Sequence, residues 1–154
     1  MTIAHDELSS ALMLNEVQLS NTEVLYLAEC LQNKEHMYRE DALNTIAELE
    51  HFYSVLKNTN FEMSVPSPMV DKAWHQHILN TKMYNIFSRQ HFGLEILHHL
   101  PFWSGNTGNM EEIWGVGGEP SLLDVYNAIV VMFGFENVNK TVWLMDEDDL
   151  NRFL

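Results

Sequence analysis

The residues with the greatest chemical capability lie near the middle of the chain. His75 and His77 are one residue apart, and Asp71 precedes His75 by four positions. Imidazole and carboxylate groups are ligands for zinc and iron, and they also transfer protons. Residues four apart on a helix lie on one edge, so Asp71 can orient the His75 imidazole or accept its proton. Asp71 is therefore a candidate catalytic group.

A regular helix cannot offer both histidines to one ion. At about 100° per residue, His75 and His77 point roughly 200° apart, and a shared metal would require an irregular turn. His77, Tyr84 and His91 recur every seven residues and share a stripe that is otherwise apolar. Because buried polar groups need partners, we expect His77 and Tyr84 to hydrogen-bond each other's neighbours, a water or a bound ligand.

A third histidine can complete a metal site. His98 and His99 stand shortly before Pro101, where at least one of them should leave the helix direction and can turn back toward the helix that carries His75 and His77. The predicted metal ligands are therefore His75, His77 and His98, with Tyr84 as a hydrogen-bond donor or proton carrier to the bound group. Zinc or iron is the expected ion. If the protein is an enzyme, we expect it to use metal-activated water or dioxygen.

Structural roles compete with this interpretation, because the same histidines can pack the core and hydrogen-bond the backbone.

Glu48 and His51 are three apart, as are Glu95 and His98, which resembles the paired Glu-x-x-His elements of di-iron bundles. Pro101 is too close to the second pair for a long helix there. A di-iron centre is therefore not our prediction.

Helical signals cover the first part of the chain. Apolar spacing predicts a first helix over about 6–19. Ser20 and Glu23 have the spacing of a capping box, which predicts a second helix over about 21–33. Apolar residues three or four apart predict a third helix over 36–56.

The candidate histidines belong to a fourth predicted helix. Ser67 and Pro68 form a start signal, and Gly93 is placed to close the helix in a left-handed conformation. We therefore expect one continuous helix from Pro68 to about His91. Since it is apolar around most of its circumference, we expect it to be the central helix of the fold.

The last part of the chain predicts one more helix. Ser121 and Asp124 repeat the capping-box spacing, and Gly134 follows as a stop signal. Before it, the segment between Gly93 and Pro120 is rich in glycine and contains two tryptophans, which predicts a long loop. Residues 141–144 are expected to form a short strand. The predicted fold class is all-α, with about five helices.

Composition limits the possible partners and surroundings. The 154 residues include 22 acidic and 8 basic side chains, for a net charge of -14. This charge repels phosphate backbones and anionic lipids, so we expect no nucleic-acid and no membrane partner. One cysteine and no apolar signal segment favour the cytoplasm, and the length favours one domain over 1–154. The charge also supports an alternative function, a non-catalytic interaction module of inhibitor or immunity type that binds a basic protein.

The segment Pro68-Met-Val-Asp-Lys-Ala-Trp-His-Gln-His-Ile-Leu79, followed by Tyr84, Phe92-Gly93 and His98, resembles the glycine-rich domain-containing protein-like family. A looser downstream pattern includes Tyr126, Phe133-Gly134 and Trp143. The resemblance implies that one set of residues recurs together as a constellation: Asp71, Trp74, His75, His77, Tyr84 and His98. It names no reaction. The long members carry a glycine-rich tail and this sequence does not, so the resemblance implies no RNA-binding role here.

Overall fold

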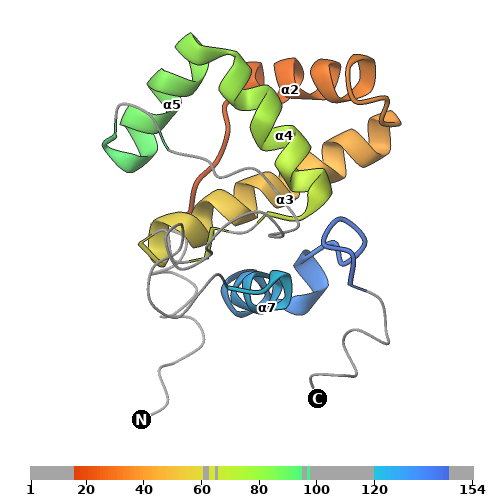
Figure 1. The fold of residues 1–154 in the computed structure, drawn as a ribbon, viewed down its shortest axis with the longest axis vertical. Coiled ribbons are helices and arrows are strands. Elements are labelled where there is room, and N and C mark those ends of the chain that lie inside the picture. The colour runs from red at the N-terminus through yellow and green to blue at the C-terminus, as the bar shows by residue number, and fades with distance from the viewer. Residues whose placement is uncertain (1–15, 61–62, 65, 95–96, 98–119, 146–154) are drawn as a thin grey trace, which may run out of the picture.

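The computed structural model describes residues 16–60, 63–64, 66–94, 97 and 120–145. This part of the chain is mainly α-helical and contains no strand, so the predicted fold class is confirmed. Figure 1 labels the helices, which are α2 (Asn21–Asn33), α3 (Arg39–Asn58), α4 (Pro68–Leu79), α5 (Thr81–Phe92) and α7 (Leu122–Phe133), followed by the short 3-10 helix η1 (Phe135–Asn137).

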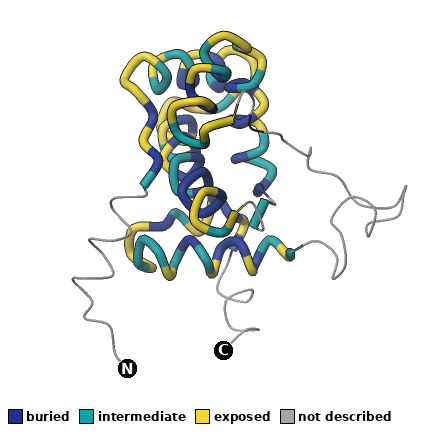
Figure 2. The backbone as a smooth tube through the Cα atoms, turned by 90° about the vertical axis from the view of Figure 1, so that its left-hand side faces the viewer, coloured by how far each residue is buried: buried dark blue, intermediate teal, exposed yellow. Residues whose placement is uncertain are grey.

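Helix α3 lies between the other helices. It packs against α2 and α4 on one side and against α7 on the other, while α4 also contacts α2 and α5 (Figure 1). Each of these helices contains buried residues, which are dark blue in Figure 2. Trp74 of α4 and Tyr53 of α3 are both buried there. The central position predicted for one helix is thus shared by α3 and α4.

The helix ends follow the predicted signals. Ser20 and Glu23 form a reciprocal capping box at the start of α2, and Ser121 and Asp124 form another at the start of α7. The Ser67 hydroxyl accepts a hydrogen bond from the Val70 amide, with Pro68 in the first turn of α4. Gly93 closes α5 with a φ of 67°, a left-handed conformation that glycine adopts without steric cost.

The continuous helix predicted from Pro68 to about His91 is wrong. The chain breaks at Asn80, whose φ and ψ are -86° and 79°, and α4 and α5 are separate helices. The Asn80 side chain accepts a hydrogen bond from the Met83 amide at 3.3 Å and so caps α5. An asparagine that bonds the following backbone favours a helix start over a helix interior.

Other element predictions also need correction. Residues 141–144 form a turn in place of the expected strand, because the Asn139 side chain accepts hydrogen bonds from the amides of Thr141 and Val142. The third helix begins at Arg39, three residues later than expected, since His36 has a φ of 58°. Of the helix predicted over 6–19, residues 16–19 are not helical and the rest lie outside the described residues, as does most of the predicted glycine-rich loop.

The segment before α2 is fastened to α3. The Val17 amide donates to the Ser54 hydroxyl at 2.8 Å, and the Leu19 amide donates to Glu50 Oε2 at 2.8 Å. Val17 and Leu19 are also buried in the core. These contacts fix the start of α2, and with it Glu23, against the C-terminal half of α3.

None of the described helices combines the length and the apolar character that a membrane crossing requires.

Candidate functional site

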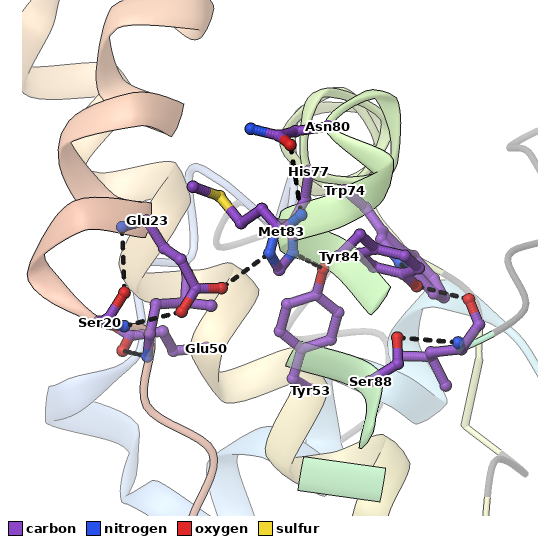
Figure 3. A network of polar contacts seen from close by, with 12 residues as sticks. Ser20, Glu23, Glu50, Tyr53, Trp74, His77, Asn80, Met83, Tyr84 and Ser88 are labelled. Carbon is purple, nitrogen blue, oxygen red and sulfur yellow. Dashed lines mark hydrogen bonds and ion pairs between the residues drawn. The ribbon is translucent and has the colours of Figure 1, made fainter. Parts of the chain in front are cut away.

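His77 is the centre of a buried polar chain that joins three helices. Its side chain is 0% exposed. Nδ1 lies 2.7 Å from the Tyr53 hydroxyl of α3, and Nε2 lies 2.9 Å from Glu23 Oε2 of α2 (Figure 3). We call Tyr53, His77 and Glu23 the relay. The expectation that His77 would need polar partners is met within the protein itself.

The charge of Glu23 determines how the hydrogens of the relay are arranged. Burial acts to raise the pKa of the Glu23 carboxyl, but hydrogen bonds from His77 and from the Ser20 amide and hydroxyl outweigh it, so the pKa is lowered. An ionised carboxylate only accepts hydrogen bonds, so His77 Nε2 must carry the proton that faces it. In the neutral ring, Nδ1 then accepts from the Tyr53 hydroxyl.

Tyr53 is suited to the donor role at the inner end of the relay. Burial raises the pKa of its hydroxyl well above the ordinary value of 10.0, and the nearby Tyr84 and Glu23 add to the shift. The phenol therefore keeps its proton at neutral pH. The relay runs from a neutral phenol in the core to a carboxylate near the surface.

The capping box that begins α2 also holds Glu23 in place. Glu23 Oε1 accepts a hydrogen bond from the Ser20 amide at 3.0 Å, and the Ser20 hydroxyl accepts one from the Glu23 amide. The side chain of Glu23 is 13% exposed, so one edge of the carboxylate still reaches solvent. Each carboxylate oxygen has two acceptor positions, which leaves capacity for a further donor.

Glu23 lines a pocket between α2 and α5. The pocket has a volume of about 380 Å³ and its wall includes Ser20, Thr22, Glu23, Asn80, Lys82, Met83, Ile86, Phe87 and Gln90. The α5 residues are spaced three or four apart and so share one helix face. Phe87 also contacts the His77 ring, with centroids 4.6 Å apart. The outer end of the relay therefore opens on a recess of ligand size.

Tyr84 takes part in a second buried contact beside the relay. Its hydroxyl accepts a hydrogen bond from Trp74 Nε1 at 2.9 Å and donates one to the Leu97 carbonyl at 2.5 Å. Its ring meets the His77 ring edge to face, with centroids 5.0 Å apart. Burial raises the pKa of the Tyr84 hydroxyl, so it is a neutral donor at physiological pH. The catalytic role predicted for Tyr84 stays a prediction.

The other predicted site residues do not converge within the described part of the chain. His75 is exposed while His77 is buried, as the helical geometry predicts for their opposite directions. Asp71 is partly buried in the first turn of α4, and His98 lies outside the described residues. Among the described residues, no group of three histidine, cysteine or acidic side chains could hold a metal ion. Metal ligation by His75, His77 and His98, and catalysis by Asp71, remain predictions.

Sequence reasoning missed both partners of His77. Glu23 is predicted only as part of a helix cap, and Tyr53 lies on the apolar face of the third predicted helix without being singled out. They lie 54 and 24 residues from His77 in the chain, and no local spacing connects them. The available signal for Tyr53 was a polar hydroxyl on a helix face that is otherwise apolar.

A separate polar cluster surrounds Glu48 on the opposite side of α3. Glu48 is 2% exposed and accepts hydrogen bonds from Trp143 Nε1 at 2.8 Å and from the Asn139 amide at 3.1 Å. Its neighbour His51 lies 3.1 Å away and stacks on Phe133. Glu48 thus fastens the C-terminal turn to α3, which is a structural role.

A family model described as UCP032817-like matches residues 12–109, more than half of the chain. The predicted membership of the glycine-rich domain-containing protein-like family is therefore wrong, because the family whose model matches is a different one. The relay and the pocket lie within the matched range. No curated protein and no solved structure matches the chain.

Proposed function

The chain belongs to the UCP032817-like family, whose name states no activity, and we propose that it is a binding protein for a small organic cation. The ligand occupies the pocket between α2 and α5, and its ammonium group pairs with the Glu23 carboxylate. The observation that carries this proposal is that the relay holds an ionised carboxylate at the wall of a ligand-sized recess.

The fixed position of Glu23 supports recognition over a merely solvated charge. A free surface glutamate loses side-chain entropy when it binds a ligand, whereas Glu23 is already held by Ser20 and His77. Its partial burial also strengthens its attraction for a cation, because water screens the pair less. Preorganisation of this kind is what a binding site needs.

The rest of the pocket suits a ligand with an apolar part. The apolar residues Met83, Ile86 and Phe87 line the pocket on α5. Phe87 is buried, whereas the side chain of Ile86 is 56% exposed. A ligand that covers Ile86 would remove apolar surface from water and so gain affinity. Ser20, Thr22 and Gln90 supply polar groups at the same wall.

Titration with phenethylamine, observed by amide chemical shifts, tests the proposal. It has an ammonium group and a small apolar ring, and its saturable shifts should cluster in the first turn of α2 and along α5. Glu23→Gln should weaken binding about tenfold, because the amide keeps a similar shape and loses the charge. Glu29→Gln, which removes an exposed charge from the same helix, is the matched control. Absence of saturable binding, or equal weakening in both variants, would reject the pocket.

Two proposals made from the sequence use other observations. A zinc or iron protein would take its ligands from His75, His77 and His98, as the sequence predicts. Elemental analysis of untagged protein, with His75→Ala and His77→Ala as variants, tests that proposal.

An interaction module for a basic protein rests on the net charge of -14, and it predicts an affinity for that protein that falls steeply as the salt concentration rises.

A further inference from the structure

The pocket between α2 and α5 presents two opposite charges. Glu23 reaches it from the first turn of α2, and Lys82 reaches it from the first turn of α5. They are the two charged side chains among the residues that line this pocket. A ligand with only an ammonium group uses one of them and leaves the other without a partner.

The break at Asn80 is what brings Lys82 to the pocket. It begins α5 as a separate helix, and the cap on Met83 fixes the first turn that carries Lys82. From Lys82 the helix face continues through Met83, Ile86 and Phe87, since residues three or four apart lie together. One face of α5 therefore offers a cation followed by an apolar strip, with Glu23 across from it on α2.

We infer that the ligand is a free amino acid with an apolar side chain. This inference rests on the proposed function, because it uses the same pocket and the same Glu23 anchor. The ammonium group of the ligand pairs with Glu23, its carboxylate pairs with Lys82, and its side chain covers Met83 and Ile86. Binding is reversible and involves no covalent step.

The size of the pocket agrees with this ligand class. A volume of about 380 Å³ lies at the lower end of the range for small-molecule sites, roughly 300 to 1,000 Å³. It accommodates a single amino acid with a side chain as large as phenylalanine. The Thr22 hydroxyl lies at the same wall as the two charges, beside the capping side chains of Ser20 and Asn80.

Four compounds with the same ring separate the possible ligands. L-phenylalanine has both charges, phenethylamine lacks the carboxylate, 3-phenylpropionate lacks the ammonium group, and phenylalanine amide imitates the N-terminus of a peptide. We expect L-phenylalanine to bind about fivefold more tightly than phenethylamine or phenylalanine amide, the ratio that a partly exposed ion pair supplies. 3-Phenylpropionate should bind most weakly, because Glu23 repels it.

Substitution of Lys82 by methionine completes the test, since methionine keeps an apolar stem and removes the charge. Lys82→Met should reduce the affinity for L-phenylalanine to that for phenethylamine in the same variant, and it should not weaken phenethylamine binding, because it removes a cation that repels the ammonium group. Lys72→Met, at an exposed lysine on α4, is the control and should change neither.

The outcomes distinguish this inference from the proposed function. If phenethylamine or phenylalanine amide binds as tightly as L-phenylalanine, or if Lys82→Met has no effect, the amino-acid ligand is rejected while a cation-binding pocket stands. An equal affinity for phenylalanine amide would assign the site to a peptide N-terminus. If none of the four compounds binds, both the inference and the proposed function fail.

Discussion

The two ring nitrogens of His77 have different hydrogen-bond partners, so a substitution of His77 would affect both of these partners. One nitrogen faces the Tyr53 hydroxyl in the core and the other faces the Glu23 carboxylate near the pocket. A buried histidine with two such contacts contributes to stability and also sets the protonation of its partners. The structural role and the proposed binding role of His77 are therefore connected through Glu23.

Substituting phenylalanine for His77 keeps a ring in the core and removes both nitrogens. The buried Tyr53 hydroxyl and the Glu23 carboxylate would lose their partner, so we expect the free energy of unfolding to fall by about 3 kcal/mol. Urea denaturation measures this change. His75→Phe, at the exposed histidine of the same helix, should change stability by less than about 0.5 kcal/mol. Equal effects at the two positions would contradict the assignment of the buried histidine.

Much of this residue-scale picture could be predicted, but not the partners. The opposite directions of His75 and His77 follow from helical geometry, whereas the ring contact between Tyr84 and His77 is made across the break at Asn80. Glu23 and Tyr53 meet His77 only because three helices pack together, and no pattern within one helix records that packing. The pocket was missed for the same reason, since its two walls come from α2 and α5.

At the scale of elements, the two capping boxes are equivalent in local structure and different in surroundings. Both Ser20 and Ser121 accept a hydrogen bond from the third residue of their helix and donate their own amide to its side chain. The box of α2 also positions the carboxylate that meets His77. The box of α7 has no connection to the pocket.

Alanine at each capping serine separates helix stability from ligand recognition. Ser20→Ala and Ser121→Ala should each lower the free energy of unfolding by about 1 kcal/mol, because each loses one cap hydrogen bond. Only Ser20→Ala should also weaken phenethylamine binding, since it loosens Glu23. Denaturation and the amide-shift titration together measure both effects. A matching loss of binding in Ser121→Ala would point to general destabilisation.

Helix α3 holds the C-terminal turn through Glu48, and this contact has a measurable strength. Glu48→Ala would leave the buried Trp143 indole N–H and the Asn139 amide without their acceptor, so the free energy of unfolding should fall by about 3 kcal/mol. Hydrogen exchange of the Trp143 indole should accelerate as well. Unchanged exchange in this variant would show that the turn is held by packing alone.

The prediction of a single helix from Pro68 to about His91 shows where element-scale reasoning failed. The apolar stripe continues across Asn80, and periodicity alone therefore predicts no interruption. The preference of asparagine for a helix start was the signal, and the Asn80 side chain does cap α5 at this position. The break matters because it creates one wall of the pocket.

At the scale of the whole molecule, the net charge of -14 means that most acids repel one another, yet the pKa values of two partly buried acids, Glu23 and Glu50, shift in opposite directions. Burial raises the pKa of Glu50, and the neighbouring Glu16 and Glu23 add to this shift although the Leu19 amide and His51 oppose it. Glu23 has a lowered pKa because its hydrogen bonds outweigh burial. The ionised Glu23 therefore stabilises the folded protein fully at a pH above its ordinary pKa of 4.5, and this stabilisation is lost as the pH falls through its lower pKa in the folded state. Glu50 has the opposite effect, because its ionisation destabilises the folded protein as the pH rises above 4.5.

The titration of the Glu23 carboxyl, followed by carbon NMR, tests the central claim most directly. The relay predicts that Glu23 titrates below 4.5 in the folded protein while Glu50 titrates above it, and that His77→Phe raises the Glu23 value because burial then acts with less opposition. A Glu23 carboxyl that titrates above 4.5 in the unaltered protein, or that ignores the loss of His77, would contradict an ionised anchor at the pocket.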